Sequence, residues 1–250
     1  MLITGGTSGI GFAVAKAFLR EGASVLICGR SEERGRVALD QLTDFGGEIR
    51  FLAADVRDEL MVKRLVQCAV DSFSNLDVAF NNAGVFLPEP GLDDHTTGLW
   101  EDVIAANLTG VYHCVKHEIL AMRSVPGESH RAIVNNASIV AHRGSQSSGL
   151  AYTAAKHGVL GLTKQAAINH VADNIRVNAV SPGPTLTEAT KAGLEGVPEE
   201  VQEKIKALNP AGTLVDEDEI AATVLFLCSG SATMINGHDI PLDGGQLAKL

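Results

Sequence analysis

The sequence predicts one α/β domain over residues 1–250, built as a doubly wound parallel sheet of about seven strands flanked by helices on both faces. Short apolar runs bounded by turn residues alternate with longer helical patterns, which is the rhythm of strand–helix–strand units. Polar residues follow several of these runs directly, at the edge where open α/β sheets bind ligands. The chain contains no internal repeat or evident domain boundary, and its 45% of apolar residues is enough for one core.

Seven apolar segments are predicted to be strands and six longer segments to be helices. The strands are expected at residues 1–3, 24–28, 49–53, 76–80, 132–137, 174–180 and 240–242. The helices are expected at 12–20, 32–45, 59–73, 100–122, 152–171 and 220–228, the fourth interrupted near 107–110. The first strand is short for the centre of a parallel sheet, so either the natural start lies upstream or a shortened strand suffices.

Charge, apolar runs and cysteine spacing disfavour several classes of protein. The formal net charge of −10 disfavours a nucleic-acid or acidic-membrane partner. The longest apolar runs fall far short of the ~20 residues that span a bilayer, and no signal peptide is evident, so we expect a soluble, cytoplasmic protein. The four cysteines lie far apart without ligand spacing, which predicts buried thiols in a reducing compartment and no metal site.

A glycine-rich turn follows the first predicted strand. Gly5, Gly9 and Gly11 have the spacing G-x-x-x-G-x-G and precede a helical pattern. Glycines at such a turn let the chain bend tightly, approach a diphosphate closely and pack the next helix against the sheet. The N-terminus of that helix then faces the negative charge. The context of strand, turn and helix therefore predicts a dinucleotide-binding site.

The end of the second predicted strand indicates which dinucleotide binds. An acidic residue at this place would bind the ribose hydroxyls and repel a 2′-phosphate. Gly29 occupies the place instead and Arg30 follows it, and a guanidinium binds a phosphate through two parallel hydrogen bonds. We therefore expect NADP, with NAD less favoured; the alternative is that Arg30 is a solvated loop charge. Asp55, after the third strand, is expected to accept a hydrogen bond from adenine, to cap the next helix, or both.

Asparagines mark two further places. Asn81 and Asn82 end the fourth predicted strand, and a small Ala-Gly pair follows them. This suits amides that fix the backbone beside a flat cofactor, and a plain turn is the alternative. Asn107 interrupts a helical segment, where its amide competes for backbone hydrogen bonds. We expect there a local bend that holds a water, or a simple misfit.

Tyr152 and Lys156 lie four residues apart in an alanine- and glycine-rich predicted helix, so both side chains project from one face. A free tyrosine has a pKa near ~10, and a neighbouring ammonium lowers that pKa by stabilising the phenolate. The pair is therefore suited to proton transfer, although packing beside a solvated charge would give the same spacing. Ser138 ends the fifth strand, at the edge of the sheet where ligands bind.

The long segment 185–210 is expected to be irregular or weakly helical and to form a lid or binding loop for the substrate. The run Asp216-Glu217-Asp218-Glu219 after it predicts a capping box for the following helix.

In this order the motifs resemble those of the short-chain dehydrogenase/reductase family over essentially the whole chain, which implies a Rossmann-type fold. The matching pieces are Thr4-Gly5-x-x-x-Gly9-Ile10-Gly11, Asn81-Asn82-Ala83-Gly84, Asn107, Ser138, the Tyr152/Lys156 pair, Pro182-Gly183 with Thr187, and Asp243-Gly244-Gly245. The resemblance implies that Tyr152 is the general acid or base and that Ser138 holds the substrate oxygen. Lys156 would bind the nicotinamide ribose and lower the tyrosine pKa, and Asn107 would complete a water-mediated proton relay.

The resemblance also implies the cofactor contacts and the assembly. The expected cofactor-binding residues are Gly5, Ser8, Gly9, Ile10, Gly11, Arg30, Ser31, Asp55, Val56, Asn82, Ala83, Gly84, Tyr152, Lys156, Pro182, Gly183, Thr185 and Thr187. A homotetramer, or a homodimer, is expected through the helices that contain Asn107 and Tyr152.

The predicted function is NADP(H)-dependent interconversion of a secondary alcohol and a ketone by hydride transfer. One alternative is a 3-oxoacyl-[acyl-carrier-protein] reductase, which a basic docking patch beside the pocket would favour. Another is a non-catalytic dinucleotide-binding scaffold or sensor. The sequence leaves the substrate open; Ser138, His142, Ser145 and Tyr152 are expected to contact it, with a plain surface histidine as the alternative for His142.

Overall fold

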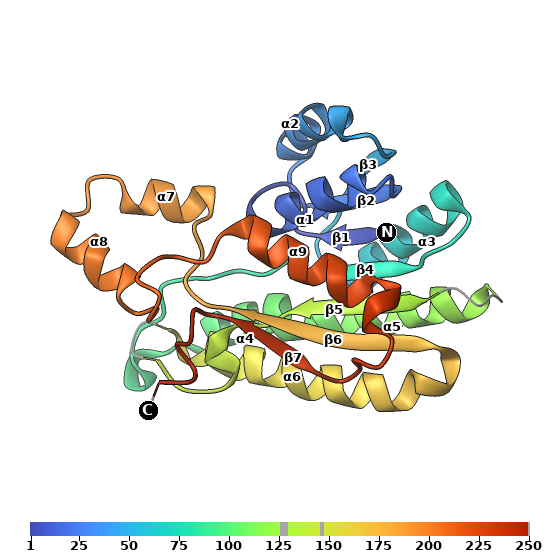
Figure 1. The fold of residues 1–250 in the computed structure, drawn as a ribbon. Coiled ribbons are helices and arrows are strands. Elements are labelled where there is room, and N and C mark those ends of the chain that lie inside the picture. The colour runs from blue at the N-terminus through green and yellow to red at the C-terminus, as the bar shows by residue number, and fades with distance from the viewer. Residues whose placement is uncertain (126–129, 146–147, 250) are drawn as a thin grey trace.

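Seven parallel strands form one sheet in the order β3-β2-β1-β4-β5-β6-β7 in the computed structural model, which describes residues 1–125, 130–145 and 148–249 (Figure 1). The strands are β1 (Leu2–Thr4), β2 (Val25–Gly29), β3 (Ile49–Ala53), β4 (Val78–Asn81), β5 (Arg131–Asn136), β6 (Ile175–Pro182) and β7 (Asp239–Leu242). The chain order reverses between β1 and β4, and the carboxyl ends of strands at such a point form a ligand-binding crevice.

Helices cover both faces of this sheet (Figure 1). One face carries α1 (Gly9–Arg20), α2 (Glu32–Leu42) and α9 (Glu217–Cys228), and the other carries α3 (Glu59–Phe73), α5 (Gly110–Ser124) and α6 (Leu150–His170). Side chains of one strand alternate between the two cores: Ile3 packs on the α1 side and Leu2 on the α5 side. Because both faces are covered, the central strands are continuous apolar runs.

The remaining elements lie around the crevice or connect the layers. α4 (Thr97–Ile104) continues through a π-helical turn, Ala105–Thr109, into α5. α7 (Glu188–Leu194) and α8 (Glu199–Lys206) follow β6 and project from the end of the sheet (Figure 1). Short 3-10 turns lie at Thr43–Phe45, Leu92–Asp94, Ile139–Ala141, Val171–Asp173 and Gly230–Ala232.

The predicted doubly wound parallel fold is confirmed, with shifts of a few residues at the ends of elements. The first strand is only three residues long, yet it occupies the centre of the sheet and is fully buried. The segment expected to be weakly helical contains α7 and α8, and the capping box of Asp216 and Glu219 is formed. In the part of the chain that the structure describes, no helix is long and apolar enough to cross a membrane.

Candidate active site

The glycine-rich turn connects β1 to α1 and leaves no room for a side chain at Gly5 or Gly11. Gly5 has φ +66°, in the left-handed region, and a β-carbon on Gly11 would overlap the carbonyl oxygen of Gly5. Ser8 is the N-cap of α1 and makes no side-chain cap hydrogen bond. The first N–H groups of α1 are therefore available to an anionic group at the turn.

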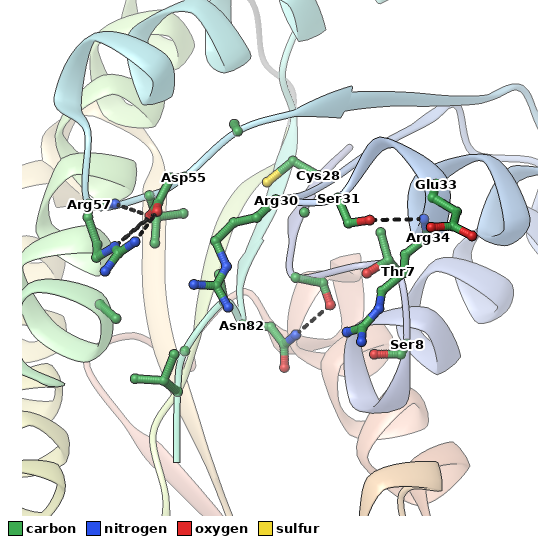
Figure 2. A pocket seen from close by; sticks show the side chains of 18 residues that line it. Thr7, Ser8, Cys28, Arg30, Ser31, Glu33, Arg34, Asp55, Arg57 and Asn82 are labelled. Atoms are coloured by element: carbon green, nitrogen blue, oxygen red, sulfur yellow. Dashed lines mark hydrogen bonds and ion pairs between the residues drawn. The ribbon is translucent and has the colours of Figure 1, made fainter. Parts of the chain in front are cut away.

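A cavity of about 800 Å³ opens in front of this turn (Figure 2). Nine of the residues predicted to bind the cofactor line it: Gly5, Ser8, Arg30, Ser31, Asp55, Val56, Asn82, Ala83 and Gly84. Ser8 and Gly9 also line a neighbouring cavity of about 300 Å³. The other predicted contacts, which are Ile10, Gly11, Tyr152, Lys156, Pro182, Gly183, Thr185 and Thr187, line neither of these two cavities. The larger cavity has the size of a typical cofactor site.

Three arginines contribute to the wall of the larger cavity. Arg30 follows β2 and extends into the cavity, with Arg57 and Arg34 on either side of it in Figure 2. Arg34 lies in the first turn of α2, where its backbone N–H donates to the Ser31 side chain at 3.3 Å. Ser31 thus caps α2 as well as lining the cavity. Guanidinium groups gathered in one cavity suit a phosphate ester.

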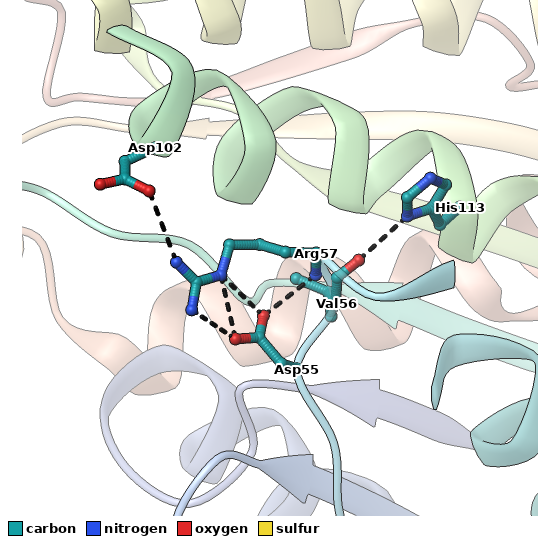
Figure 3. A network of polar contacts seen from close by, with 5 residues as sticks. All are labelled: Asp55, Val56, Arg57, Asp102 and His113. Atoms are coloured by element: carbon teal, nitrogen blue, oxygen red, sulfur yellow. Dashed lines mark hydrogen bonds and ion pairs between the residues drawn. The ribbon is translucent and has the colours of Figure 1, made fainter. Parts of the chain in front are cut away.

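The third arginine is paired with Asp55 (Figure 3). The Arg57 guanidinium donates to one carboxylate oxygen of Asp55 at 2.6 Å and to the other at 3.1 Å, and this pairing lowers the pKa of Asp55. Asp102 of α4 lies 3.8 Å from the same guanidinium. The prediction that Asp55 caps the next helix is wrong, because Asp58 is the N-cap of α3 and accepts from its N–H groups. The network fixes the loop after β3 against α4.

Asn82 fixes the glycine turn to the end of β4. Its side-chain amide donates to the carbonyl oxygens of Thr4 at 3.2 Å and Gly5 at 3.0 Å. Its own amide oxygen accepts from the side chain of Asn136 at 2.8 Å. The carbonyl oxygen of Asn136 in turn accepts from the Lys156 ammonium at 2.6 Å. A continuous polar chain therefore joins the glycine turn to Lys156.

Tyr152, Lys156 and Ser138 come together as predicted. The Lys156 nitrogen lies 5.5 Å from the centroid of the Tyr152 ring, and the Ser138 side chain is near enough to Tyr152 to lower the pKa of the phenol. Burial acts in the opposite direction and is the larger effect, so the pKa of Tyr152 is raised. Burial also lowers the pKa of Lys156 to about 8. The expectation that Tyr152 has a lowered pKa beside the ammonium is therefore wrong for the protein alone, because desolvation is the largest effect on this pKa.

Asn107 lies in the π-helical turn and is buried. Its amide nitrogen donates to the carbonyl oxygens of Val85 at 2.9 Å and Val103 at 3.0 Å. Its amide oxygen accepts from the Val85 N–H at 3.1 Å. The predicted interruption of the helix is confirmed, and the side chain serves to tie it to the segment after β4. The predicted role of Asn107 in a water relay stays a prediction.

The predicted substrate contacts differ in their surroundings. His142 has its Nε2 2.7 Å from Asp239, a carboxylate that also accepts from Ser181 at 2.9 Å. His142 is exposed, which supports the alternative of a plain surface histidine. Ser145 is only partly buried and adjoins residues 146–147, which lie outside the described part of the chain. The roles of His142 and Ser145 toward a substrate stay predictions.

Four residues that the fold brings to this region are absent from the sequence-based prediction. Arg34 and Arg57 line the larger cavity, Asn136 holds Lys156, and Glu89 contacts the first turn of α6. Arg34 follows Arg30 by four residues, a spacing that a search for clustered cations would have found. Glu89 carries no such signal, because it is 62 residues away from its partner Ala151.

Comparison with known proteins gives matches over the full length. A family model described as enoyl-(acyl carrier protein) reductase matches residues 5–246. Cis-4-hydroxycyclohexanecarboxylate dehydrogenase from Sinomonas cyclohexanicum is 37% identical, over 99% of this chain and 96% of that protein. The 3-oxoacyl-[acyl-carrier-protein] reductase FabG from Chlamydia pneumoniae is 35% identical, over 98% of this chain and 95% of that protein. A solved structure described as ElxO with NADP bound has a TM-score of 0.92 and 34% identity, over 99% of this chain and 98% of that one.

The structural match agrees with the parallel sheet flanked by helices described above. The chain belongs to the short-chain dehydrogenase/reductase family of oxidoreductases.

Proposed function

We propose that this protein is an NADP(H)-dependent oxidoreductase that interconverts a secondary alcohol and a ketone, with Tyr152 as the general acid or base. The observation that carries the proposal is the cluster of Ser138, Tyr152 and Lys156 beside the end of β5. Reduction of a ketone places negative charge on its oxygen, so a hydrogen-bond donor and a proton source must both reach that oxygen. A serine hydroxyl and a tyrosine phenol supply these two groups.

Each side chain has a defined part in reduction. An ordinary tyrosine is already protonated at neutral pH, and burial raises the pKa of Tyr152 further, so its phenol can donate a proton to the carbonyl oxygen. Ser138 donates a hydrogen bond to the same oxygen. When the phenol loses its proton, the ammonium of Lys156 lies near enough to stabilise the phenolate. Asn136 holds that ammonium in place. Oxidation of an alcohol reverses these steps.

The larger cavity fits a phosphorylated dinucleotide. Its glycine turn has no space for a side chain at Gly5 or Gly11, and Arg30 and Arg34 are suited to a 2′-phosphate. The similar ElxO structure has NADP bound, which supports the same choice of cofactor. When bound, NADP(H) would accept or supply the hydride. Lys156 would hold its ribose, Asp55 its adenine, and the segment 182–187 its nicotinamide end.

The name of the Sinomonas relative suggests a first class of substrate. It is a dehydrogenase of a hydroxylated cyclohexane, so alicyclic ketones and alcohols belong in the first panel of compounds. The proposed substrate-binding loop, residues 185–210, contains α7 and α8, which would close over such a ring.

The Chlamydia relative supports a second candidate, reduction of a 3-oxoacyl group on acyl carrier protein. A basic docking patch would favour this candidate. The α7 and α8 region, residues 188–206, instead has five carboxylates and three lysines, and Lys204 and Lys206 are each paired with a glutamate. We therefore rank this candidate second.

We also propose a cytoplasmic homotetramer, with a homodimer as the alternative. Large apolar side chains are exposed on the helices expected to pair, including Tyr112 and Leu120 on α5 and Ile168 on α6. The four cysteines are free thiols, three of them buried, which suits a reducing compartment. Light scattering of the purified protein measures the assembly, and a mass of one chain would contradict the proposal.

The experiment that tests the function has two stages. NADPH and NADH are titrated side by side by fluorescence, and tight binding of NADPH with weaker NADH binding is expected. A panel of alicyclic ketones, open-chain ketones and 3-oxoacyl thioesters is then assayed by NADPH oxidation. Turnover of a ketone supports the proposal. Tight binding with no turnover across the panel would favour a scaffold or sensor, and binding of neither cofactor would contradict both functions.

A further inference from the structure

A segment far from α6 in sequence contacts the first turn of that helix, which carries Tyr152. Glu89, between β4 and α4, accepts a hydrogen bond from the Ala151 N–H at 2.7 Å and from the Tyr152 N–H at 3.1 Å. Ala151 and Tyr152 are the second and third residues of α6, so their N–H groups have no partner within the helix. A distant carboxylate therefore caps the helix of Tyr152.

The local sequence cannot cap this helix itself. The N-cap residue is Gly149, which has no side chain, whereas a serine or aspartate there would bind the same two N–H groups. A β-carbon on Gly149 would overlap the carboxyl group of Glu89. The backbone of Gly149, with φ −70° and ψ 158°, is open to any residue. Glycine is thus required here for space, because Glu89 occupies the place of a local cap.

His95 holds Glu89 in position. Its Nε2 lies 2.9 Å from the Glu89 carboxylate, and the two side chains are 4% and 0% exposed. Its Nδ1 lies 3.2 Å from the carbonyl oxygen of Thr96. Burying a carboxylate without hydrogen-bond partners costs free energy, so His95 and the two N–H groups of α6 together hold the Glu89 side chain in one position.

The same segment touches two other parts of the site. The ring of Phe86 packs edge to face on the ring of Tyr152, with centroids 5.1 Å apart. The backbone of Val85 makes its N–H and carbonyl hydrogen bonds with the Asn107 side chain. One stretch of ten or so residues thus contacts both the backbone and the ring of Tyr152 and is itself anchored on Asn107.

We propose that Glu89, held by His95, is a positioning residue that sets the place of the Tyr152 phenol relative to Ser138 and Lys156. It acts through the backbone of α6 and touches neither reacting atoms nor the larger cavity. Its loss should therefore slow turnover and leave cofactor binding unchanged. This inference rests on the proposed acid/base function of Tyr152. A helix cap alone would affect only stability, because it would not link α6 to the segment that carries Phe86.

Two variants separate positioning from capping. Glu89→Ala removes both hydrogen bonds to α6 and frees the space beside Gly149. The double variant Glu89→Ala/Gly149→Asp restores a cap for the same N–H groups from within the local chain. Glu89→Ala should lower Tm by about 2–4 °C and kcat by about 10- to 100-fold, with the Kd for NADPH unchanged. The double variant should regain most of the Tm and retain the low kcat.

Glu59→Ala is the matched control, because Glu59 also pairs with a histidine, His117 at 3.1 Å, but on the surface of α3 and α5. Its kcat should equal that of the wild type. Recovery of kcat in the double variant, or a kcat within twofold of wild type in Glu89→Ala, would overturn the inference in favour of a plain helix cap.

A readout without turnover keeps this test separate from the proposed function. The chain has two tyrosines, so in a Tyr112→Phe background the NMR signal of 13C-labelled tyrosine belongs to Tyr152 alone. Glu89→Ala should shift this signal, and the shift should persist in the double variant. An unchanged signal would overturn the inference. Failure of the wild-type protein to reduce any ketone, with this shift still observed, would count against the proposed function alone.

Discussion

The ammonium nitrogen of Lys156 lies 5.5 Å from the centroid of the Tyr152 ring; the Lys156 side chain is buried and Tyr152 is partly buried. Burial acts on the two groups in opposite directions, raising the pKa of Tyr152 and lowering that of Lys156 to about 8. Burial therefore shifts both groups toward their neutral forms, although a lysine with a pKa of about 8 is still mostly an ammonium at pH 7. The phenol of Tyr152 has a higher pKa than a tyrosine in water, and the ammonium of Lys156 has a lower pKa than a surface lysine.

Tyr152→Phe removes the phenol and keeps the ring that packs against Phe86. We expect kcat for ketone reduction to fall by about 100- to 10,000-fold, the contribution typical of a positioned proton donor. The Kd for NADPH should stay within about twofold of wild type, because Tyr152 does not line the larger cavity. Steady-state kinetics and fluorescence titration measure both quantities. A variant with near-normal kcat would remove Tyr152 from the acid/base role.

Lys156→Met should change how stability depends on pH. In the folded protein Lys156 has a pKa of about 8, against 10.5 for an ordinary lysine, so between these values the unfolded chain binds more protons. The free energy of unfolding of the wild type therefore rises with pH across this window. Between pH 7 and pH 10 the free energy of unfolding of the wild type should therefore increase by about 2–3 kcal/mol relative to that of Lys156→Met.

Urea unfolding at a series of pH values measures this difference. Lys204→Met serves as the control, since the Lys204 side chain is 70% exposed, and its stability should run parallel to the wild type. Parallel curves for wild type and Lys156→Met would mean that burial does not perturb Lys156. The same variant should lose ketone reduction at all these pH values, because the phenolate of Tyr152 would lose its neighbouring charge.

Arg30→Ala tests the choice of cofactor. Loss of a charged hydrogen-bond donor to a phosphate raises the Kd by about 10- to 100-fold. We expect that loss for NADPH and less than about threefold for NADH, with a similar but smaller effect for Arg34→Ala. Arg36→Ala is the control, because Arg36 is exposed on the same helix and does not line the cavity. An equal effect of Arg30→Ala on both cofactors would remove the reason to assign a 2′-phosphate to these arginines.

The local parts of the fold and site could be predicted from the sequence. Buried parallel strands are continuous apolar runs, and the glycine turn has a fixed spacing. Tyr152 and Lys156 are four residues apart, so they lie on one face of their helix wherever that helix packs. The capping box of Asp216 and Glu219 is likewise local, and it is formed as expected.

The remaining features depend on contacts between distant segments. Glu89 reaches Ala151 across 62 positions, and Lys156 reaches Asn136 across 20, so no pattern in the sequence pairs them. The direction of the Tyr152 pKa shift also depends on packing. The i, i+4 spacing identifies the nearby charge, but the burial that raises this pKa comes from the whole site. Asp55 could not be distinguished from Asp58 as the cap of α3, because both precede the same helix.

Glu118 of α5 is a buried carboxyl group outside the candidate active site, and it should make the stability of the protein depend on pH. It is fully buried, it accepts from the Asn81 side chain at 2.9 Å, and its other oxygen has no hydrogen-bond partner among the described residues. Burial raises its pKa from 4.5 to about 8. Between these values the folded state binds more protons than the unfolded state, so the free energy of unfolding falls as pH rises through this window.

Glu118→Gln keeps the shape of the side chain and removes the titration. Its stability relative to the wild type should therefore increase by about 2–4 kcal/mol between pH 5 and pH 8 and then remain constant. Glu200→Gln is the control, since the Glu200 side chain is 80% exposed, and it should follow the wild type at every pH. A constant difference between Glu118→Gln and wild type would mean that Glu118 keeps an ordinary pKa. The neutral amide retains an acceptor for Asn81, so a loss of stability at pH 5 is not expected, and urea unfolding at pH 5 checks this directly.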